Sequence, residues 1–290
     1  MNFKKVKLVY FSATGTTQKI LESIAKGIAV EDVEHINLTL PGNIPQAVKP
    51  FSDELVIMGA PVYGGRLPVE AINRFKLLKA AKTPVVLIVL YGNREFDDAL
   101  LEINNIAIEL DFIPLAAGAF IGEHSFATKD IPIAGGRPDN LDIEKAITFG
   151  EEIKEKFTVL ESLDALSELE VPGSFPYVAG GAKPMEVAPT TNEEICTLCG
   201  MCAEVCPTAA ITVKEAVATE TKQCIRCSAC IKKCPEDARF WNDDGMEKII
   251  NWLQDKCSAR KEPHFFGVKG STSLPAVGPT TLSNCKKSCC

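Results

Sequence analysis

Eight of the twelve cysteines in this chain fall into two copies of one pattern, C-x2-C-x2-C-x3-C-P. The copies are Cys196, Cys199, Cys202, Cys206 with Pro207, and Cys224, Cys227, Cys230, Cys234 with Pro235. The two-residue gaps let three successive sulfur atoms point into one volume, as a [4Fe–4S] cluster requires, and in two-cluster proteins the fourth ligand comes from the other run. The spacing therefore predicts a first cysteine set, Cys196, Cys199, Cys202 and Cys234, and a second cysteine set, Cys224, Cys227, Cys230 and Cys206.

Zinc sites and disulfides are the alternative uses of grouped cysteines. Structural zinc sites usually present C-x2-C pairs separated by about a dozen residues or more, whereas both runs here have three cysteines at two-residue gaps before the fourth. Disulfide frameworks are typical of small secreted domains. We expect no secretory signal in this chain, because its first apolar stretch is short and has the pattern of a strand. The cysteine pattern therefore favours iron–sulfur clusters over zinc sites and over disulfides.

The cysteine-rich segment at residues 190–243 resembles a bacterial two-cluster ferredoxin. Apolar residues such as Ile195, Ile211 and Ile225 interleave with the cysteines, and an apolar shell helps to set the potential of a cluster. The resemblance implies that this segment moves single electrons. We therefore expect another part of the chain to exchange electrons with it.

The N-terminal segment has the pattern of an anion site. Residues 5–11 (KVKLVYF) predict a strand, residues 16–29 show helical periodicity, and a hydroxyl-rich turn lies between them. The amides at a helix start and the Ser and Thr hydroxyls can all donate to a phosphate. Because the G-x-G-x-x-G signature and a Gly-Lys-Ser/Thr ending are absent, a phosphate monoester is the predicted ligand. An ordinary helix cap is the alternative.

Four more strand-like runs alternate with helical patterns. The strands are predicted at residues 33–39, 54–60, 84–91 and 112–121, and the helices at 68–80, 95–110 and 140–157. The runs at 54–60 and 84–91 are almost entirely apolar, as expected for strands buried on both faces of a parallel sheet. This alternation predicts an α/β fold with a doubly wound parallel sheet.

Two segments that contain aromatic residues and glycine follow the third and fourth strands, at residues 61–68 (PVYGGRLP) and 91–98 (YGNREFDD). A flat ring needs aromatic or apolar walls, and glycine lets a peptide turn over beside it. Ordinary turns, and core packing of Tyr63 and Tyr91, are the alternatives. Beside a phosphate turn, at the carboxyl ends of the strands, the two segments favour a flavin site.

Together these motifs resemble the flavodoxin–ferredoxin fusion family over residues 1–245. The turn at 12–17 is similar to the flavodoxin phosphate loop S/T-x-T-G-x-T, although Thr16 stands where asparagine is frequent, and residues 59–68 are similar to the family loop G-x-P-V-Y-x-G-R-L-P. The stretches 122–126 (GEHSF) and 136–139 (GRPD) also resemble the family. The resemblance implies a flavodoxin-like five-stranded sheet of order 2-1-3-4-5 and a small α+β 2[4Fe–4S] ferredoxin-like domain.

The same resemblance implies that FMN is the flavin. Its expected contacts are Ser12, Ala13, Thr14, Gly15, Thr16, Thr17, Pro61, Val62, Tyr63, Gly64, Gly65, Arg66, Tyr91, Gly92, Asn93, Arg94, Phe96 and Asp97. Both tryptophans lie beyond the cysteine runs, at Trp241 and Trp252. We therefore expect a tyrosine, Tyr63 or Tyr91, to flank the flavin ring.

The expected domain boundaries follow from these motifs. Residues 1–160 form the flavin domain, 161–189 a breaker-rich linker, 190–245 the cluster domain, and 246–290 a helix at about 246–259 followed by a loose tail. The linker is either flexible or anchored to the first domain through aromatic and apolar residues such as Phe175, Tyr177 and Val178. The remaining cysteines fit no cluster run and are expected to be spare or packed thiols: Cys257, Cys285, Cys289 and Cys290.

Charge and the scarce histidines limit the function classes. The net charge is −7, neither half is basic, and nucleic acid is therefore not an expected partner. The apolar runs are shorter than the ~20 residues that span a membrane, and dense thiolates favour a cytoplasmic location. His35, His124 and His264 are too spread out for a di-iron site. His124 is either a turn residue or a neighbour of the flavin, and three arginines are candidate anion contacts: Arg66, Arg94 and Arg137.

The predicted function is electron transfer between FMN and two [4Fe–4S] clusters, with a redox protein as donor or acceptor and no catalytic residue assigned. The first alternative is a flavin-dependent reductase that acts on a small acceptor. The second is a redox-sensing module. The direction of electron flow and the oligomeric state are not predicted.

Overall fold

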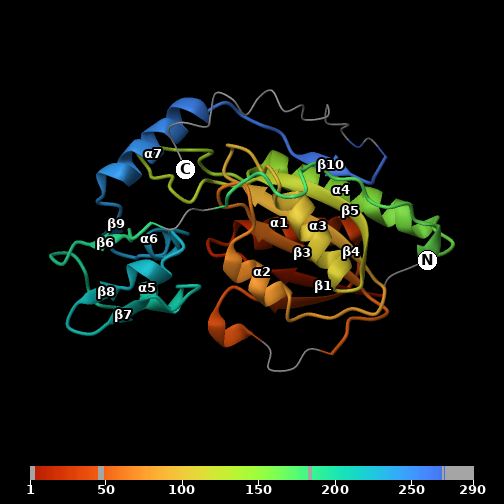
Figure 1. Cartoon of the computed structure of the whole chain (residues 1–290), viewed down its shortest axis with the longest axis horizontal. Coiled ribbons are helices and arrows are strands. Elements are labelled where there is room, and N and C mark those ends of the chain that lie inside the picture. Colours follow the sequence, from red (N-terminus) through yellow and green to blue (C-terminus); the bar gives the residue numbers. More distant parts are fainter. Residues whose placement is uncertain (1–3, 45–48, 182–184, 270, 272–290) are drawn as a thin grey trace.

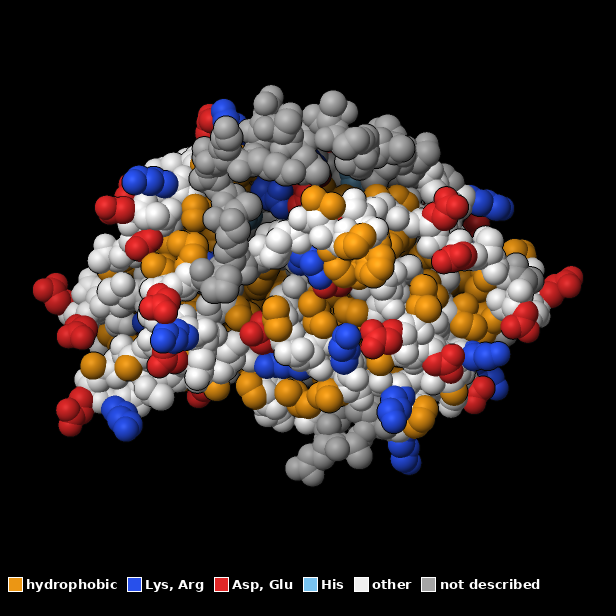
Figure 2. All heavy atoms as spheres, viewed as in Figure 1, with side chains coloured by type: hydrophobic (Ala, Val, Ile, Leu, Met, Phe, Trp, Pro, Cys, Tyr) orange, Lys and Arg blue, Asp and Glu red, His pale blue; other side chains and the backbone are white. Residues whose placement is uncertain are grey.

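The computed structural model describes residues 4–44, 49–181, 185–269 and 271. A large α/β domain lies beside a small cysteine-rich domain, and helix α7 (Asp244–Lys256) leads from the small domain back toward the large one (Figure 1). On the face shown in Figure 2, acidic and basic side chains are interspersed with exposed hydrophobic ones. None of the helices in the described ranges is long and apolar enough to cross a membrane.

The large domain is built on a six-stranded sheet of order β10-β5-β4-β3-β1-β2. Its strands are β1 (Lys5–Tyr10), β2 (Asp32–Asn37), β3 (Leu55–Pro61), β4 (Thr83–Tyr91), β5 (Phe112–Ile121) and β10 (His264–Phe266). The first five pair in parallel, so the predicted order 2-1-3-4-5 is confirmed. Strand β10 is antiparallel to β5, and the sequence analysis did not predict this sixth strand.

Four helices cover the two faces of the sheet: α1 (Thr16–Ile28), α2 (Val69–Phe75), α3 (Ala99–Glu109) and α4 (Asn140–Thr158). Helices α1 and α4 share one hydrophobic core with the sheet, and α2 and α3 share the other. Strand β4 is buried along its whole length, because both faces are covered. Helix α2 ends five residues earlier than predicted, although Leu78 beyond its end is still buried in the core.

The small domain contains two two-stranded sheets and two short helices. Strand β6 (Thr190–Thr191) pairs with β9 (Arg239–Phe240), and β7 (Ile211–Val213) pairs with β8 (Val217–Thr219). Helices α5 (Met201–Glu204) and α6 (Ala229–Lys232) each contain the third cysteine of a run, Cys202 and Cys230. The two runs share an unusual backbone, because Leu198 and Arg226, at matching positions, both have left-handed φ values of 54° and 55°.

The linker is bound to the large domain. The buried carboxylate of Asp98 accepts hydrogen bonds from the linker amides of Ser174, Val178 and Ala179 at 2.7–2.8 Å. Tyr177 lies under the Arg66 guanidinium, 4.0 Å from ring centre to Cζ, and its hydroxyl accepts from Asn105 at 3.0 Å. Of the three expected anchors, Tyr177 contacts the domain by its side chain. Phe175 and Val178 are largely exposed, and Val178 is held through its amide.

A C-terminal strap, residues 257–266, returns to the large domain after α7. The expected boundaries placed these residues in a loose tail, but His264–Phe266 pair with β5 and Phe265 stacks on Phe149 of α4 with ring centres 4.7 Å apart. Strand β10 has only three residues, so pairing with β5 rather than local propensity forms it. Cys285, Cys289 and Cys290 lie outside the described residues.

Candidate flavin and iron–sulfur sites

The structure brings the first cysteine set together. Cys196, Cys199 and Cys202 line one cavity with Cys234 of the other run, in agreement with the predicted crossing. The amide of Ala238 donates to the Cys234 sulfur at 3.2 Å. Amide donors of this kind stabilise a thiolate ligand and tune its redox potential.

The second cysteine set is grouped in the same crossed way. Burial raises the pKa values of the Cys224, Cys227 and Cys230 thiols, and the neighbouring Cys206 of the other run contributes to each rise. The amide of Ala210 donates to the Cys206 sulfur at 3.3 Å, as Ala238 does for Cys234. Each fourth cysteine therefore lies next to the other run with a matching amide donor.

The cysteine sets suit a group larger than one ion. Within the described ranges, no three His, Cys, Asp or Glu side chains are arranged to hold a single metal ion. Zinc holds its sulfur ligands at about 2.3 Å and so draws them close together. Four cysteines line one cavity, and four thiolates around one space are the ligand set of an iron–sulfur cubane.

The turn at residues 12–17 leads from β1 into α1. Gly15 precedes the helix with φ of 90°, a left-handed value that favours glycine. The hydroxyl of Ser12 accepts from the Gln18 amide at 3.2 Å, while no side chain caps the helix at Gly15. Since the first amides of an α-helix have no intrahelical acceptor, the amides of Thr16 and Thr17 are available to an anion.

The buried hydroxyl of Thr17 also fits a phosphate. Thr17 is 1% exposed, and its Oγ1 has no hydrogen-bond partner in the described part of the chain. An unsatisfied buried hydroxyl is costly, and a phosphate oxygen at this helix start would satisfy it together with the free amides. The turn therefore fits an FMN phosphate better than a simple helix cap.

Replacing Thr17 by Val is expected to weaken FMN binding about tenfold, since a hydrogen bond to a charged group contributes about 1.5–3 kcal/mol. Valine keeps the shape of threonine without the hydroxyl, so the folded apoprotein should be no less stable. Fluorescence titrations with FMN and with riboflavin, which lacks the phosphate, measure the effect. An equal loss for both ligands would contradict the assignment of Thr17 to the phosphate.

The loops after β3 and β4 are packed against each other. Residues 63–66 form a tight turn in which Gly64 and Gly65 have φ values of 62° and 84°, and the Tyr63 amide donates to the Arg66 carbonyl at 2.8 Å. The Asp98 amide donates to the Gly65 carbonyl at 3.1 Å. Gly65 also sits so close to Asp97 that an added Cβ would lie 2.4 Å from its Oδ2, which excludes a larger residue.

Several predicted flavin contacts have protein partners instead. The Arg66 guanidinium pairs with Glu102 and donates to the Ala179 carbonyl. Arg94 pairs with Asp97. Tyr91 is 2% exposed and packs on Phe96, with ring centres 5.4 Å apart. Tyr91 is therefore a core residue, which was the alternative to a flavin contact.

Two predicted residues of these loops keep features that suit a ligand. The side-chain amide of Asn93 donates to the strap carbonyls of Cys257 and Ala259, while its Oδ1 is buried without a partner among the described residues. Tyr63 is half-buried and lies beside Cys227 and Ser125. Because Tyr91 is in the core, Tyr63 is the tyrosine left to flank a ring.

His124 lies against the loop that follows β4. A Cβ added to Gly92 would be 2.3 Å from the His124 ring, and the ring Nδ1 accepts from the Phe126 amide at 3.0 Å. Burial, followed by the charges of Lys232 and Arg94, lowers the pKa of His124 from 6.5 to about 4. His124 is therefore neutral at pH 7 and carries its ring proton on Nε2.

The low pKa of His124 makes stability depend on pH. The imidazole binds a proton near pH 6.5 in the unfolded chain and only near pH 4 in the folded one. The contribution of His124 to the free energy of unfolding is therefore complete above pH 6.5 and is lost between pH 6.5 and 4. At pH 5 the expected loss is about 2 kcal/mol relative to pH 7. Urea unfolding of the wild type and of His124→Asn, which keeps an acceptor but does not titrate, measures the difference. Parallel pH profiles for both would refute this assignment.

The small domain docks at the carboxyl edge of the sheet, where the loops lie. Burial raises the pKa of Tyr63 well above its usual range, and the charge of the Cys227 thiolate adds to the rise. Lys232 of α6 pairs with Glu123, and Ile225 packs on the core of the large domain. The second cysteine set therefore faces the predicted flavin loops.

Arg74 of α2 ties the two domains together. It is 7% exposed, and its guanidinium donates to the carbonyls of Leu38 and Thr39 in the large domain and to Pro207 in the small one. The sequence pattern of helix α2 did not indicate that Arg74 has this role. Nor did the pattern around α3 indicate the roles of Asp98 and Glu102.

Replacing Arg74 by Met is expected to lower the free energy of unfolding by about 2–3 kcal/mol, because three carbonyls lose a charged donor. The linker should also become more sensitive to protease as the domains separate. Lys76→Met is the matched control, since its ion pair with Glu109 is exposed and contributes less than about 1 kcal/mol. Equal unfolding midpoints for the two variants would contradict the docking role.

Comparisons with known proteins bear on both domains. Residues 189–212 match the family described as 4Fe-4S binding domain, which spans the first cysteine run. Among curated proteins, no match to the chain was found. The chain is similar to a solved flavodoxin from the domain Archaea, with 16% identity, a TM-score of 0.35, and coverage of 53% of this chain and 99% of that one.

Two further solved structures are similar to the same part of the chain. A Fusobacterium nucleatum flavodoxin bound to flavin mononucleotide has 17% identity and a TM-score of 0.37, and covers 53% of this chain and 99% of its own. Rubredoxin oxygen:oxidoreductase from Desulfovibrio gigas has 13% identity and a TM-score of 0.35, and covers 55% of this chain and 38% of its own.

The fold itself rests on the observed strand order. The large domain has the flavodoxin-like order 2-1-3-4-5, and the small domain contains a 4Fe-4S binding domain. A redox role follows from the iron–sulfur domain, because such clusters exchange electrons. The chain thus joins a flavodoxin-like domain to a ferredoxin-like domain, as its sequence resemblance implied.

Proposed function

We propose that this protein transfers electrons between a bound FMN and two [4Fe–4S] clusters, and exchanges single electrons with a redox protein partner. The observation that carries the proposal is the docking of the small domain, through Lys232, Ile225 and Pro207, at the edge of the sheet where the predicted flavin loops lie. Electron transfer requires the flavin and the clusters to be close. Arg74 binds the small domain to the large one, and the linker is hydrogen-bonded to the large domain.

The residues of the chain have distinct roles in this proposal. The free amides of α1 and the Thr17 hydroxyl bind the FMN phosphate, and the loops at 61–66 and 91–98 enclose the ring. When bound, FMN supplies one- and two-electron chemistry, and the clusters supply one-electron chemistry. The neutral His124 adds no charge beside the Gly92 peptide.

Anaerobic purification followed by iron, sulfide and FMN analysis tests the proposal. We expect about eight iron and eight sulfide per FMN, from two four-iron clusters. Zinc in place of iron would contradict the proposed electron transfer. A protein that does not take up FMN would contradict the proposed flavin site. Rapid reduction of the clusters should then bleach the flavin absorption within one molecule, at a rate independent of protein concentration.

A flavin-dependent reductase is the second candidate, and His124 is the observation that favours it. A buried, neutral imidazole beside the predicted ring could donate a hydrogen bond from Nε2 to negative charge that develops on a small acceptor. Steady turnover with small acceptors that falls at least a hundredfold in His124→Asn would support this role. Turnover that requires an added redox protein would support the relay instead.

A further inference from the structure

The side chain of Arg239 is buried between the two cysteine sets. Arg239 is 3% exposed and lines the cavity that the first set surrounds. Its Nη2 also donates to the sulfur of Cys230, in the second set, across 3.8 Å. One guanidinium therefore contacts both predicted cluster sites.

Neutral groups hold this guanidinium in place. Nη1 donates to the Thr191 hydroxyl at 2.7 Å, and Nη2 donates to the Thr219 hydroxyl at 2.9 Å. Its Nε is buried and has no hydrogen-bond partner in the described part of the chain. No carboxylate in those ranges lies within 4.0 Å of the guanidinium, in contrast to Arg66 and Arg137, which pair with acids.

A buried cation without a counter-ion is strongly unfavourable. Hydroxyl groups orient the guanidinium but do not cancel its charge. Glu236 lines the same cavity but makes no ion pair with Arg239 in the described part of the chain. The thiolates that the two cysteine sets would present to iron supply negative charge on both sides of the guanidinium, and a thiolate-bound cluster keeps part of that charge. The position thus fits an arginine only if anionic groups occupy both sites.

We propose that Arg239 is an internal counter-ion shared by both iron–sulfur clusters, and that its fixed charge makes both clusters easier to reduce. Arg239 raises the reduction potential of the clusters through its charge, and it does not itself react. Nearby positive charge stabilises the extra negative charge of a reduced cluster, and burial prevents screening by salt. This inference rests on the proposed function, because it requires clusters at both sites.

Redox titration of the full-length, anaerobically purified protein tests this inference. Dithionite donates one electron to each cluster, and the reduced fraction is followed by EPR with iron and sulfide measured on the same samples. In Arg239→Gln we expect the equilibrium constant for reduction of each cluster to fall at least tenfold, which is 59 mV for a one-electron couple. The shift should persist at 0.5 M salt.

Two further variants separate charge from shape. Arg239→Lys keeps the charge and should stay within about threefold of the wild type. Lys233→Gln removes an exposed charge one residue from Cys234 and should also change the constant less than about threefold, because water screens it. Unchanged constants in a fully loaded Arg239→Gln protein would overturn the proposal.

The outcomes remain separable if Arg239→Gln fails to assemble. Loaded clusters with near wild-type constants in Arg239→Lys would then support a role for charge. Failure of the lysine variant as well would assign Arg239 to shape and hydrogen bonding, and would overturn the proposal. A wild-type protein without iron would instead refute the proposed function itself.

Discussion

The double variant Cys199→Ala/Cys234→Ala is expected to keep one cluster, whereas Cys199→Ala/Cys206→Ala is expected to lose both. The reason is the crossing of the two runs: Cys199 and Cys234 line the same cavity, while Cys206 lies with Cys224 and Cys230. Two substitutions in one set damage a single cluster. Two substitutions divided between the sets leave neither with four thiolates.

Iron and sulfide content measures this difference directly. We expect about eight iron atoms per wild-type chain, about four in Cys199→Ala/Cys234→Ala, and close to none in Cys199→Ala/Cys206→Ala. Cys257→Ala is the control, since Cys257 is a buried thiol that packs in a separate apolar cluster, and it should keep about eight. If each run instead supplied all four ligands of its own cluster, the two double variants would exchange their iron contents.

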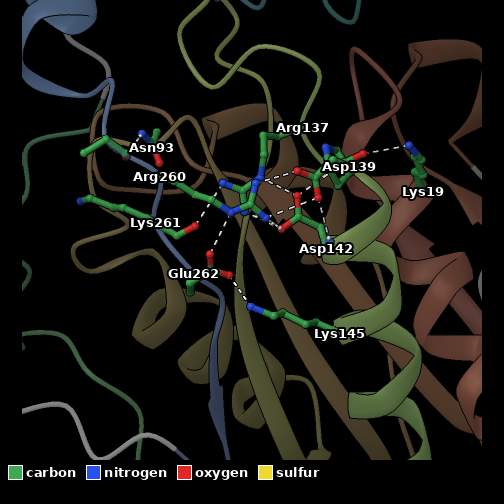
Figure 3. Close-up of polar contacts among 11 residues, drawn as sticks. Lys19, Asn93, Arg137, Asp139, Asp142, Lys145, Arg260, Lys261 and Glu262 are labelled. Carbon is green, nitrogen blue, oxygen red and sulfur yellow. Dashed lines mark hydrogen bonds and ion pairs between the residues drawn. The ribbon is translucent and has the colours of Figure 1, made fainter.

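Replacing Arg137 by Met is expected to lower the free energy of unfolding by about 3 kcal/mol, because the buried carboxylate of Asp142 loses its two-pronged partner and keeps only a 3.8 Å ion pair with Arg260. Arg137 donates from Nε and Nη2 to the two oxygens of Asp142, which is fully buried (Figure 3). Asp142 also caps α4 by accepting from the Asp139 amide at 2.9 Å. Nη1 of Arg137 donates to the Lys261 carbonyl at 3.1 Å, so the strap should loosen too.

Urea unfolding of matched variants tests the origin of that loss. Arg137→Met/Asp142→Asn should recover part of the stability, because asparagine keeps a capping oxygen and removes the buried charge. Arg260→Met is the control. Arg260 pairs with Asp139 at the surface, with 39% of its side chain exposed (Figure 3), and should cost less than about 1 kcal/mol. A double variant as unstable as the sum of its single variants would contradict the buried-charge explanation.

Local pattern was sufficient to predict the sheet of the large domain and the grouping of the cysteines. Periodicity placed β1, β3, β4 and β5 within one or two residues of their observed bounds, because strands buried on both faces are apolar throughout. The crossed grouping of Cys199 with Cys234 was predicted from the rule that two-cluster proteins take the fourth ligand from the other run, and these two cysteines line one cavity. The FMN contacts stay predictions, of which Thr17 and Asn93 have the features that suit a ligand.

Side-chain partners that are distant in the chain had no local signal. Arg66 and Arg137 were candidate anion contacts, and the structure pairs them with Glu102 and Asp142. Tyr91 entered the core because Phe96 and the strap cover it. A charge or an aromatic ring on a loop can serve a ligand, a carboxylate or a core equally well, and packing selects among these.

The sequence by itself determined the five parallel strands and the cysteine spacing within each run, because periodicity and ligand spacing act over a few residues, while the strand order came from the family resemblance. Only the tertiary structure decided how the two domains meet, through Arg74 and Tyr63, and that Arg239 is buried between the cysteine sets. The contacts between the domains join residues more than a hundred positions apart, and the position of Arg239 depends on burial of its side chain. Both arise from the packing of whole elements, which no short stretch of the chain encodes.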